Sequence, residues 1–406
     1  MIKRVFFIAV IIYLSGCNVQ RTGVVSGSKP TCEIPFEIIN NFIIINLKVN
    51  GLSDCRFIYD TGSENSLFFE RSIADLLHFK MVRKMKIYGS DLSRSISADI
   101  ALGVNFEAGE HYFKGDILVL EDNIFDLDEY FGFPIYGIVG NHMFRNKQVE
   151  INYHKQSLFI YENRTHPPSK DYKEIDSKWE FGKPYVYPEI ETQEGKSRAT
   201  LKLLFDTGAT LGLLIYDPVK SGLGYPAKII PGNLGMGLGG PLQGYVGRFY
   251  ALDLGAYQLH QVITHFHALD SVNILNDRSQ KMGILGNSLL SKFNAYIDYK
   301  NEKIYLKANK SLQEPIQSDR SGLLVIATGT NYNRFIIKEV LSGSPGDKAG
   351  IIAGDQIIGI AGKRGIFLSL NQINKLLCNS KLSSLDLRIR RDEKVLRKKI
   401  NLEDLI

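Results

Sequence analysis

The chain has 406 residues, of which 44% are hydrophobic and 11% aromatic, and its formal net charge is +6. This length predicts about three domains, and the composition is that of a globular chain rather than a disordered one. The positive charge is small and part of it lies at Lys3 and Arg4, in a segment we expect to be removed. The charge therefore gives no argument for nucleic-acid binding.

The first 16 residues combine a positive start with an apolar run, 5–14, that is too short to span a bilayer as a helix. This pattern predicts a signal peptide over 1–16. Small residues directly before Cys17 resemble a bacterial lipobox, which implies lipidation of Cys17, export, and anchoring to a bacterial membrane, inner or outer. The polar segment 17–30 is predicted to be a tether. The alternative is a plain signal peptide followed by a chance cysteine.

One apolar strand followed by Asp-Thr-Gly occurs twice in the chain. Asp206 lies 146 positions after Asp60 (206 minus 60), and the same offset separates two Gly-hydrophobic-hydrophobic-Gly elements, 137–140 and 283–286. A repeat of this length, with several landmarks at one offset, predicts two similar domains rather than two chance turns. Alternating apolar residues predict that both are β lobes, lobe one over 31–165 and lobe two over 171–312.

An acid directly after a buried strand is held in a tight turn, where Gly allows close backbone approach and Thr keeps a fixed rotamer. Two such acids facing each other share one proton, so that one acts as a base on water and the other as an acid. The duplicated motif resembles the two-lobed aspartic peptidases of the pepsin and retropepsin type. The resemblance implies a catalytic pair without cofactor or metal, formed by Asp60 and Asp206 and supported by Thr61, Gly62, Ser63, Thr207, Gly208 and Ala209.

The two copies differ directly after the glycine. Ser63 has a hydroxyl that we expect to donate to the Asp60 carboxylate, whereas Ala209 offers Asp206 nothing comparable. Hydrogen bonds to the charged form lower the pKa of a carboxyl group. We therefore expect Asp60 to be the ionised member of the pair and Asp206 to carry the proton.

One further stretch lies between the Asp-Thr-Gly motif and the later Gly-hydrophobic-hydrophobic-Gly element of each lobe. In lobe one, Tyr88 and Gly89 resemble the Tyr-Gly pair at the tip of a pepsin-type flap, although an ordinary hairpin explains them equally well. In lobe two, the run 235–240 matches the dinucleotide-binding fingerprint, but Pro241 and a strand-like stretch follow where that motif needs a helix. We reject the nucleotide interpretation and expect a flexible loop in the place of a flap.

The pattern changes after Pro315 to a short mixed domain that contains Gly343-Ser344-Pro345, Lys348-Ala349-Gly350-Ile351 and Ala353-Gly354-Asp355-Gln356-Ile357. These turn residues resemble the bacterial PDZ signature, which implies an α+β PDZ domain over 316–406. The resemblance implies a groove, walled by a helix near 370–378, that binds an extended peptide as an added strand. It also implies that a terminal carboxylate, as on a C-terminal peptide, binds at the loop formed by Ser321, Gly322, Leu323 and Leu324. The alternative is a domain that only packs on the lobes. The basic stretch 388–399 is predicted to be a solvated hairpin face.

Neither the four Cys nor the eight His have the spacing of a metal site. The sequence leaves open whether Cys32 and Cys55 form a disulfide or stay reduced. The whole pattern predicts a mainly β protein that is a membrane-tethered aspartic endopeptidase acting on a peptide or protein substrate. The alternative is a lipoprotein that binds peptides without cleaving them and has a vestigial cleft.

Overall fold

The computed structural model describes residues 29–88, 95–121, 127–162, 167, 169–237, 240–267, 279–314, 316 and 318–406. The fold is mostly β, with 51% strand and 11% helix, which confirms the mainly β prediction. The predicted signal peptide, nearly all of the tether, Cys17 and Gly89 lie outside the described residues. Within the described residues, no helix has the length and apolar character needed to cross a membrane.

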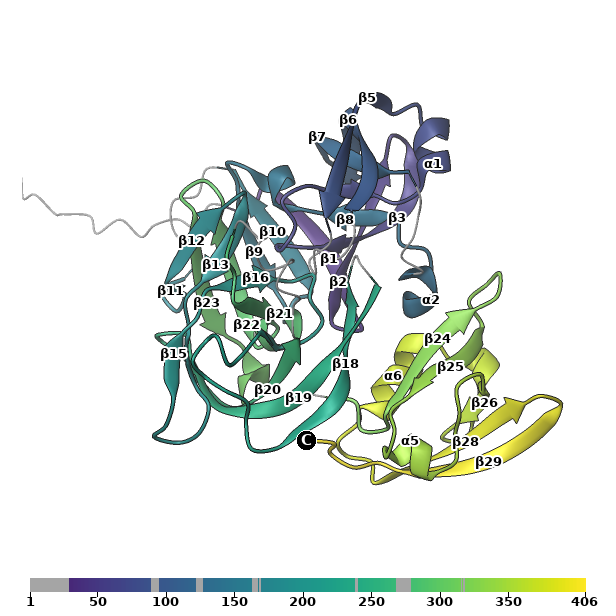
Figure 1. The fold of residues 1–406 in the computed structure, drawn as a ribbon. Helices are drawn as coiled ribbons and strands as arrows, with labels where there is room; N and C mark the ends of the chain where they lie inside the picture. The colour runs from purple at the N-terminus through teal and green to yellow at the C-terminus, as the bar shows by residue number, and fades with distance from the viewer. Residues whose placement is uncertain are drawn as a thin grey trace, which may run out of the picture.

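Lobe one consists of strands with a few short helices (Figure 1). Its chain reverses at tight turns, such as Asn40–Asn41, where both residues have positive φ. Asn adopts this conformation more readily than most residues. The elements are β1 (Cys32–Ile39), β2 (Phe42–Val49), β3 (Leu52–Tyr59), β4 (Leu67–Phe68), α1 (Arg71–Leu76), β5 (Lys80–Tyr88), β6 (Ser95–Ala108), β7 (His111–Leu120), α2 (Leu127–Phe131), β8 (Gly137–Val139), η1 (Asn141–Phe144), β9 (Gln148–Asn152) and β10 (Ser157–Tyr161).

Lobe two repeats much of this order. Its elements are β11 (Lys173–Ile175), β12 (Ser177–Glu180), β13 (Lys183–Val186), β14 (Glu189–Glu191), β15 (Arg198–Thr200), β16 (Leu203–Asp206), β17 (Leu213–Tyr216), β18 (Ile229–Gly237), β19 (Gly240–Asp253), β20 (Gln258–His267), β21 (Gly283–Gly286), α4 (Asn287–Leu290), β22 (Phe293–Asp298), β23 (Lys303–Ala308) and η2 (Lys310–Gln313). Most of the strands, apart from β11, β22 and β23, form one sheet of ten strands.

A continuous sheet joins the two lobes. Its strand order begins β11-β23-β22-β9-β10-β1, so three strands of lobe two continue directly into three of lobe one. The junction is the antiparallel pair β22 and β9, in which Ala295 lies opposite Ile151 and Ile297 opposite Val149. These four residues are buried, and the main hydrophobic core contains side chains from both lobes. The lobes are therefore held together by backbone hydrogen bonds and by a shared core.

The sequence repeat is also a repeat of strand pairing. In lobe one, β3 runs parallel to β8 with Phe57 opposite Gly137, and in lobe two β16 runs parallel to β21 with Leu203 opposite Gly283. Strands β4 and β17 pair antiparallel with the same partners, β8 and β21. Gly137 and Gly283 are required because a Cβ atom would lie 1.9 Å from the Leu67 carbonyl oxygen in one lobe and 2.0 Å from that of Leu214 in the other.

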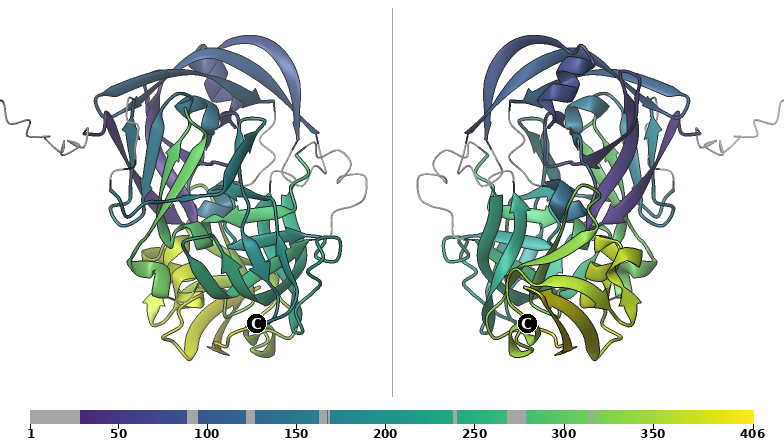
Figure 2. Two further views of the ribbon diagram at one scale, coloured as in Figure 1. Left: turned by 90° about the vertical axis from the view of Figure 1, so that its left-hand side faces the viewer. Right: turned by 90° about the vertical axis from the view of Figure 1, so that its right-hand side faces the viewer.

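Two long hairpins extend from the lobes. Strands β5 and β6 of lobe one curve over the top of the molecule, and β18 and β19 of lobe two run along the side nearest the C-terminal domain (Figures 1 and 2). Tyr88, the predicted flap residue, ends β5. Of the run 235–240, Gly235–Gly237 ends β18 and Gly240 begins β19, so a strand follows where a dinucleotide-binding turn needs a helix.

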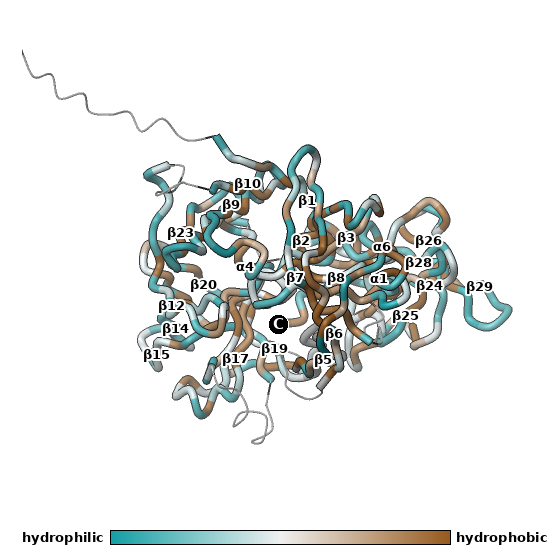
Figure 3. The backbone as a smooth tube through the Cα atoms, turned by 90° about the horizontal axis from the view of Figure 1, so that it is seen from above, coloured by the Kyte–Doolittle hydropathy of each residue, from teal (hydrophilic) through white to brown (hydrophobic). Residues whose placement is uncertain are grey.

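The C-terminal domain forms a separate six-stranded sheet with its own core. Its basic hairpin, β28 and β29, alternates buried and exposed residues along β28, and β29 is largely hydrophilic (Figure 3). This confirms the predicted solvated hairpin. The elements are β24 (Leu323–Thr328), β25 (Arg334–Val340), α5 (Pro345–Lys348), β26 (Gln356–Ile360), β27 (Lys363–Arg364), η3 (Gly365–Phe367), α6 (Leu370–Leu377), β28 (Ser384–Arg391) and β29 (Lys394–Asn401).

Candidate functional site

The two repeated acids meet at the junction of the lobes. Asp60 directly follows β3 and Asp206 ends β16, and their carboxyl groups are hydrogen-bonded to each other. Each acid packs against the glycine of the opposite loop. A Cβ atom on Gly62 would lie 2.4 Å from Asp206 Cγ, and one on Gly208 would lie 2.4 Å from Asp60 Cγ. The glycines of both Asp-Thr-Gly loops are therefore needed to bring the two carboxyl groups together.

The two carboxyl groups accept different numbers of hydrogen bonds from backbone N–H groups. Asp60 Oδ1 accepts hydrogen bonds from the N–H groups of Gly62 (2.7 Å) and Ser63 (3.1 Å). Asp206 Oδ1 accepts one from the N–H group of Gly208 (2.8 Å). The Ser63 hydroxyl instead donates to the Asn65 carbonyl oxygen, at 2.8 Å. The expectation that this hydroxyl donates to Asp60 is therefore wrong, because Asn65 lies within reach of the same hydroxyl in the turn.

The two threonines brace the loops across the pseudo-twofold axis. Thr61 Oγ1 donates to the Phe205 carbonyl oxygen (2.8 Å) and accepts from the Thr207 N–H group (3.0 Å). Thr207 Oγ1 donates to the Tyr59 carbonyl oxygen (2.9 Å) and accepts from the Thr61 N–H group (3.0 Å). Both threonines have no exposed surface. Each lobe therefore fixes the loop of the other through one hydroxyl.

A second brace surrounds the first, and it is symmetric in its Asn–Tyr hydrogen bonds but not in the groups to which the asparagines donate, since Asn287 donates to the Asn41 carbonyl oxygen (2.6 Å). Asn141 follows β8, donates to the Thr61 carbonyl oxygen (2.7 Å), and accepts from the Tyr299 hydroxyl (3.0 Å). Its equivalent, Asn287, accepts from the Tyr153 hydroxyl (2.5 Å). Sequence reasoning did not assign these four side chains a role. The signal was present, since both the asparagines and the tyrosines recur at the 146-residue offset that separates the acids.

The pKa of both acids is raised, chiefly by burial, and that of Asp206 is raised further. For Asp206, the charge of Asp60 adds to the effect of burial. For Asp60, hydrogen bonds from Asp206 and from the N–H groups of Gly62 and Ser63 oppose it. This order agrees with an ionised Asp60 and a protonated Asp206, but the cause is backbone donors rather than the Ser63 hydroxyl.

Lys183 is a charged neighbour of the pair that the sequence did not reveal. Strand β13 pairs antiparallel with β16, Tyr185 opposite Leu204, and continuing this register places Lys183 opposite Asp206. The same extrapolation in lobe one places an apolar residue, Phe42, opposite Asp60. Burial lowers the pKa of the Lys183 ammonium, and its charge lowers the pKa of both acids. The lobes therefore differ most at this position.

The turn that carries Lys183 is fixed against lobe one. The Gly182 carbonyl oxygen accepts a hydrogen bond from Asn141 Nδ2 at 3.1 Å. A Cβ atom on Gly182, whose φ is +69°, would lie 2.7 Å from the Glu64 side chain. Lys183 therefore follows a turn that contacts the loop of Asp60, while its own strand neighbours Asp206.

No group of His, Cys, Asp or Glu among the described residues is arranged to hold a metal ion. Cys32 and Cys55 are both buried free thiols, and burial raises the pKa of each to about 11. They lie on β1 and β3, which are separated by β2. Two strand spacings, about 9.6 Å, exceed the Cα separation that a disulfide spans. Cys32 and Cys55 therefore do not form a disulfide with each other, a question that the sequence left open.

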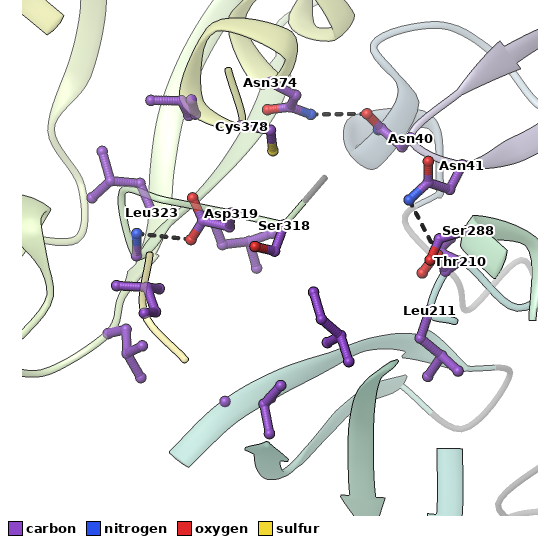
Figure 4. A pocket seen from close by; sticks show the side chains of 18 of the residues that line it. Asn40, Asn41, Thr210, Leu211, Ser288, Ser318, Asp319, Leu323, Asn374 and Cys378 are labelled. Atoms are coloured by element: carbon purple, nitrogen blue, oxygen red, sulfur yellow. Dashed lines mark hydrogen bonds between the residues drawn. The ribbon is translucent and has the colours of Figure 1, made fainter. Parts of the chain in front are cut away.

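A second candidate site lies in the C-terminal domain. Strand β24 is at the edge of its sheet, and among the described residues it pairs only with β25, while α2 and Gly132 of lobe one lie against its end at Ala327. Helix α6 faces the unpaired edge and contributes Asn374 and Lys375 to a cavity of about 760 Å³, which Cys378, directly after the helix, also lines (Figure 4). The helix begins with a capping box of Ser369 and Gln372. A free strand edge beside a helix is the arrangement that binds an extended peptide as an added strand.

The predicted carboxylate loop lines this groove, but the N–H groups of Ser321, Gly322 and Leu323 already donate to other groups. The N–H groups of Ser321 (2.9 Å) and Gly322 (2.7 Å) donate to the Asp319 carboxylate. The Leu323 N–H donates to the Ser321 hydroxyl (3.2 Å), which in turn donates to Asp319 (2.7 Å). Burial raises the pKa of Asp319, and these hydrogen bonds oppose the rise. A terminal carboxylate, which the resemblance places at this loop, would therefore meet N–H groups that already have acceptors at Gly322 and Leu323.

The C-terminal domain contacts lobe one directly. Asn374 of α6 donates to Asn40 Oδ1 (2.9 Å), at the tip of the β1–β2 hairpin. The Tyr332 hydroxyl donates to Asp128 Oδ2 (3.1 Å) on α2. These contacts leave a cavity between the domain and the lobes.

A comparison with curated proteins found no match to the chain. Residues 336–391 match the PDZ domain family. The match begins in β25 and ends with β28, so it includes helix α6 and lies within the predicted range 316–406. The C-terminal part of the chain therefore contains a PDZ domain, which suggests that it binds peptides or proteins.

Proposed function

We propose that the chain is an aspartic-type endopeptidase whose PDZ domain binds peptide or protein substrates. The observation that carries the proposal is the facing pair of buried carboxyl groups, each held by N–H groups of its own loop and packed on the glycine of the other. Two carboxyl groups in contact cannot both ionise easily, so the pair retains one proton near neutral pH.

The pair supplies both functions that hydrolysis of an amide needs. Asp60 accepts a proton from a water molecule as its oxygen attacks the carbonyl carbon of the substrate, and Asp206 donates its proton to the carbonyl oxygen. In the tetrahedral intermediate the C–N bond then breaks, the leaving amine takes the proton from Asp60, and one hydroxyl group of the intermediate returns a proton to Asp206, which restores the starting pair. The charge of Lys183 favours an ionised Asp60, which is the form in which the pair starts the reaction. No covalent intermediate with the protein is required.

The test is a digest of a pool of unlabelled synthetic peptides by the purified full chain in detergent, followed by mass spectrometry of the products. We expect cleavage by the wild type and its loss in Asp60→Asn and in Asp206→Asn. Asp386→Asn is the matched control, because Asp386 is exposed on β28 and remote from the pair. Binding of peptides without cleavage, in the same preparation, would instead support the non-catalytic alternative.

We also propose that Cys17 carries a lipid that anchors the exported protein to a bacterial membrane. The support is the apolar segment 5–14 and the small residues that precede Cys17. Tethering would place the peptidase and its PDZ domain at a membrane surface, within reach of other exported chains.

A further inference from the structure

We infer that the PDZ groove of this chain binds an internal segment of an extended polypeptide rather than a free C-terminus. The inference deepens the peptide-binding part of the proposed function and is independent of catalysis. It starts from the loop 318–322, which in the structure already holds a carboxylate, that of Asp319 (Figure 4). An incoming terminal carboxylate would have to displace that side chain or lie beside it.

Hydrogen bonds from neighbouring segments and close packing fix the loop in this arrangement. Ser321 has no exposed surface, and its carbonyl oxygen accepts from the Gly346 N–H at 2.8 Å. The Gly322 carbonyl oxygen accepts from the Leu341 N–H at 2.8 Å. Gly322 has φ +73°, and a Cβ atom there would lie 2.2 Å from Ser344. The N–H groups therefore cannot turn toward a new acceptor without disturbing the packing around them.

The charges around the cavity also disfavour a second carboxylate. Two acidic side chains, Asp319 and Glu339, line the cavity against one lysine, Lys375. Like charges placed together in a binding site repel each other, whereas an internal segment adds no terminal charge. A neutral backbone can still pair with the free edge of β24, which needs only N–H and carbonyl groups.

The cavity does not end at the loop. It continues from β24 and α6 to the tip of the β1–β2 hairpin, to β18, and to residues 210–212 of lobe two. Thr210 and Leu211 lie four and five residues after Asp206, and both are drawn across the cavity from Asp319 (Figure 4). A chain that passes the loop therefore meets the wall of lobe two. Such a continuation is possible for an internal segment and impossible for a terminus.

The experiment uses the full chain in detergent with Asp206→Asn, so that no bound peptide is cleaved. The probes are pairs of fluorescent decapeptides, selected from a random pool, that share one sequence and end either in a free carboxylate or in a carboxamide. We expect the carboxamide form to bind at least about tenfold more tightly by fluorescence anisotropy. Adding Asp319→Ala should abolish or reverse this preference, and Asp319→Asn, which keeps one acceptor for Ser321, should reduce it.

Asp347→Asn serves as the matched control, because Asp347 accepts an N–H bond from Gly343 at 2.7 Å but does not line the cavity. It should keep the wild-type preference. Circular dichroism checks that each variant is folded. Tighter binding of the free-carboxylate form to the Asp206→Asn protein, binding of neither form, or a preference that Asp319→Asn and Asp319→Ala both leave unchanged would overturn the inference. Loss of cleavage alone would not affect it.

Discussion

The crossed threonine hydrogen bonds allow a sharp test of how the two lobes hold the candidate site. Thr61→Val removes one hydroxyl and replaces it with a methyl group of similar size. The change leaves the Phe205 carbonyl oxygen and the Thr207 N–H group, both in the buried centre of the site, without their partner. Thr207→Val does the same to the Tyr59 carbonyl oxygen and the Thr61 N–H group.

The cost follows from the two orphaned backbone groups. A buried polar group left without its hydrogen bond costs about 1–3 kcal/mol, so each variant should lose about 2–6 kcal/mol of stability. The two values should be similar because the bonds have matching lengths, 2.8 and 2.9 Å for the donated bonds and 3.0 Å for both accepted bonds. The two sites contact each other, so the double variant should cost less than the sum.

The assay is urea unfolding followed by tryptophan fluorescence. Trp179, the single tryptophan, lies on β12 and packs against Tyr299 with ring centroids 5.3 Å apart, so it reports on the junction of the lobes. The control is Thr200→Val, since Thr200 is exposed at the end of β15. Midpoints of Thr61→Val and Thr207→Val within the error of that control would refute the argument that these hydroxyls brace the loops.

Three further outcomes are expected. Lys183→Met should move the acidic limb of the pH–rate profile of peptide hydrolysis to higher pH, because a charge that lowers the pKa of Asp60 is lost. Ser63→Ala should leave that limb in place, because the Ser63 hydroxyl donates to Asn65. The opposite pattern would show that the hydroxyl, and not Lys183, lowers the pKa of Asp60. Asp206→Asn should raise the free energy of unfolding at pH 7, because a carboxyl with a raised pKa contributes stability that is fully present below its unfolded pKa and is lost as pH rises through the folded pKa. The gap between variant and wild type in urea unfolding should therefore close at acidic pH, and a gap that stays constant with pH would contradict the raised pKa. Cys17→Ser should release the protein from the membrane fraction without changing hydrolysis by the purified protein, and retention in that fraction would contradict the proposed anchor.

Much of the architecture could be predicted because it is local or periodic. Alternating apolar residues define strands, and the 146-residue offset identifies two equivalent units whose strands pair in the same register. The sequence predicts that the glycine of each Asp-Thr-Gly motif allows another group to approach the backbone closely. In the structure, Gly62 and Gly208 contact the carboxyl groups of the opposite lobes. The position of the PDZ domain also follows from its turn residues and its helix.

The sequence by itself therefore determined the repeat, the paired acids and the separate C-terminal domain. Only the tertiary structure decided what each side chain contacts. Ser63 and Asp319 have several acceptors or donors within reach, and the choice between them depends on the turn that the backbone adopts. Lys183 neighbours Asp206 through a register between strands about 20 residues apart, with no motif to mark it. Hydrogen bonds between the lobes form only when both cores have packed, because the packing sets the distance between the two Asp-Thr-Gly loops. No local sequence pattern encodes that distance.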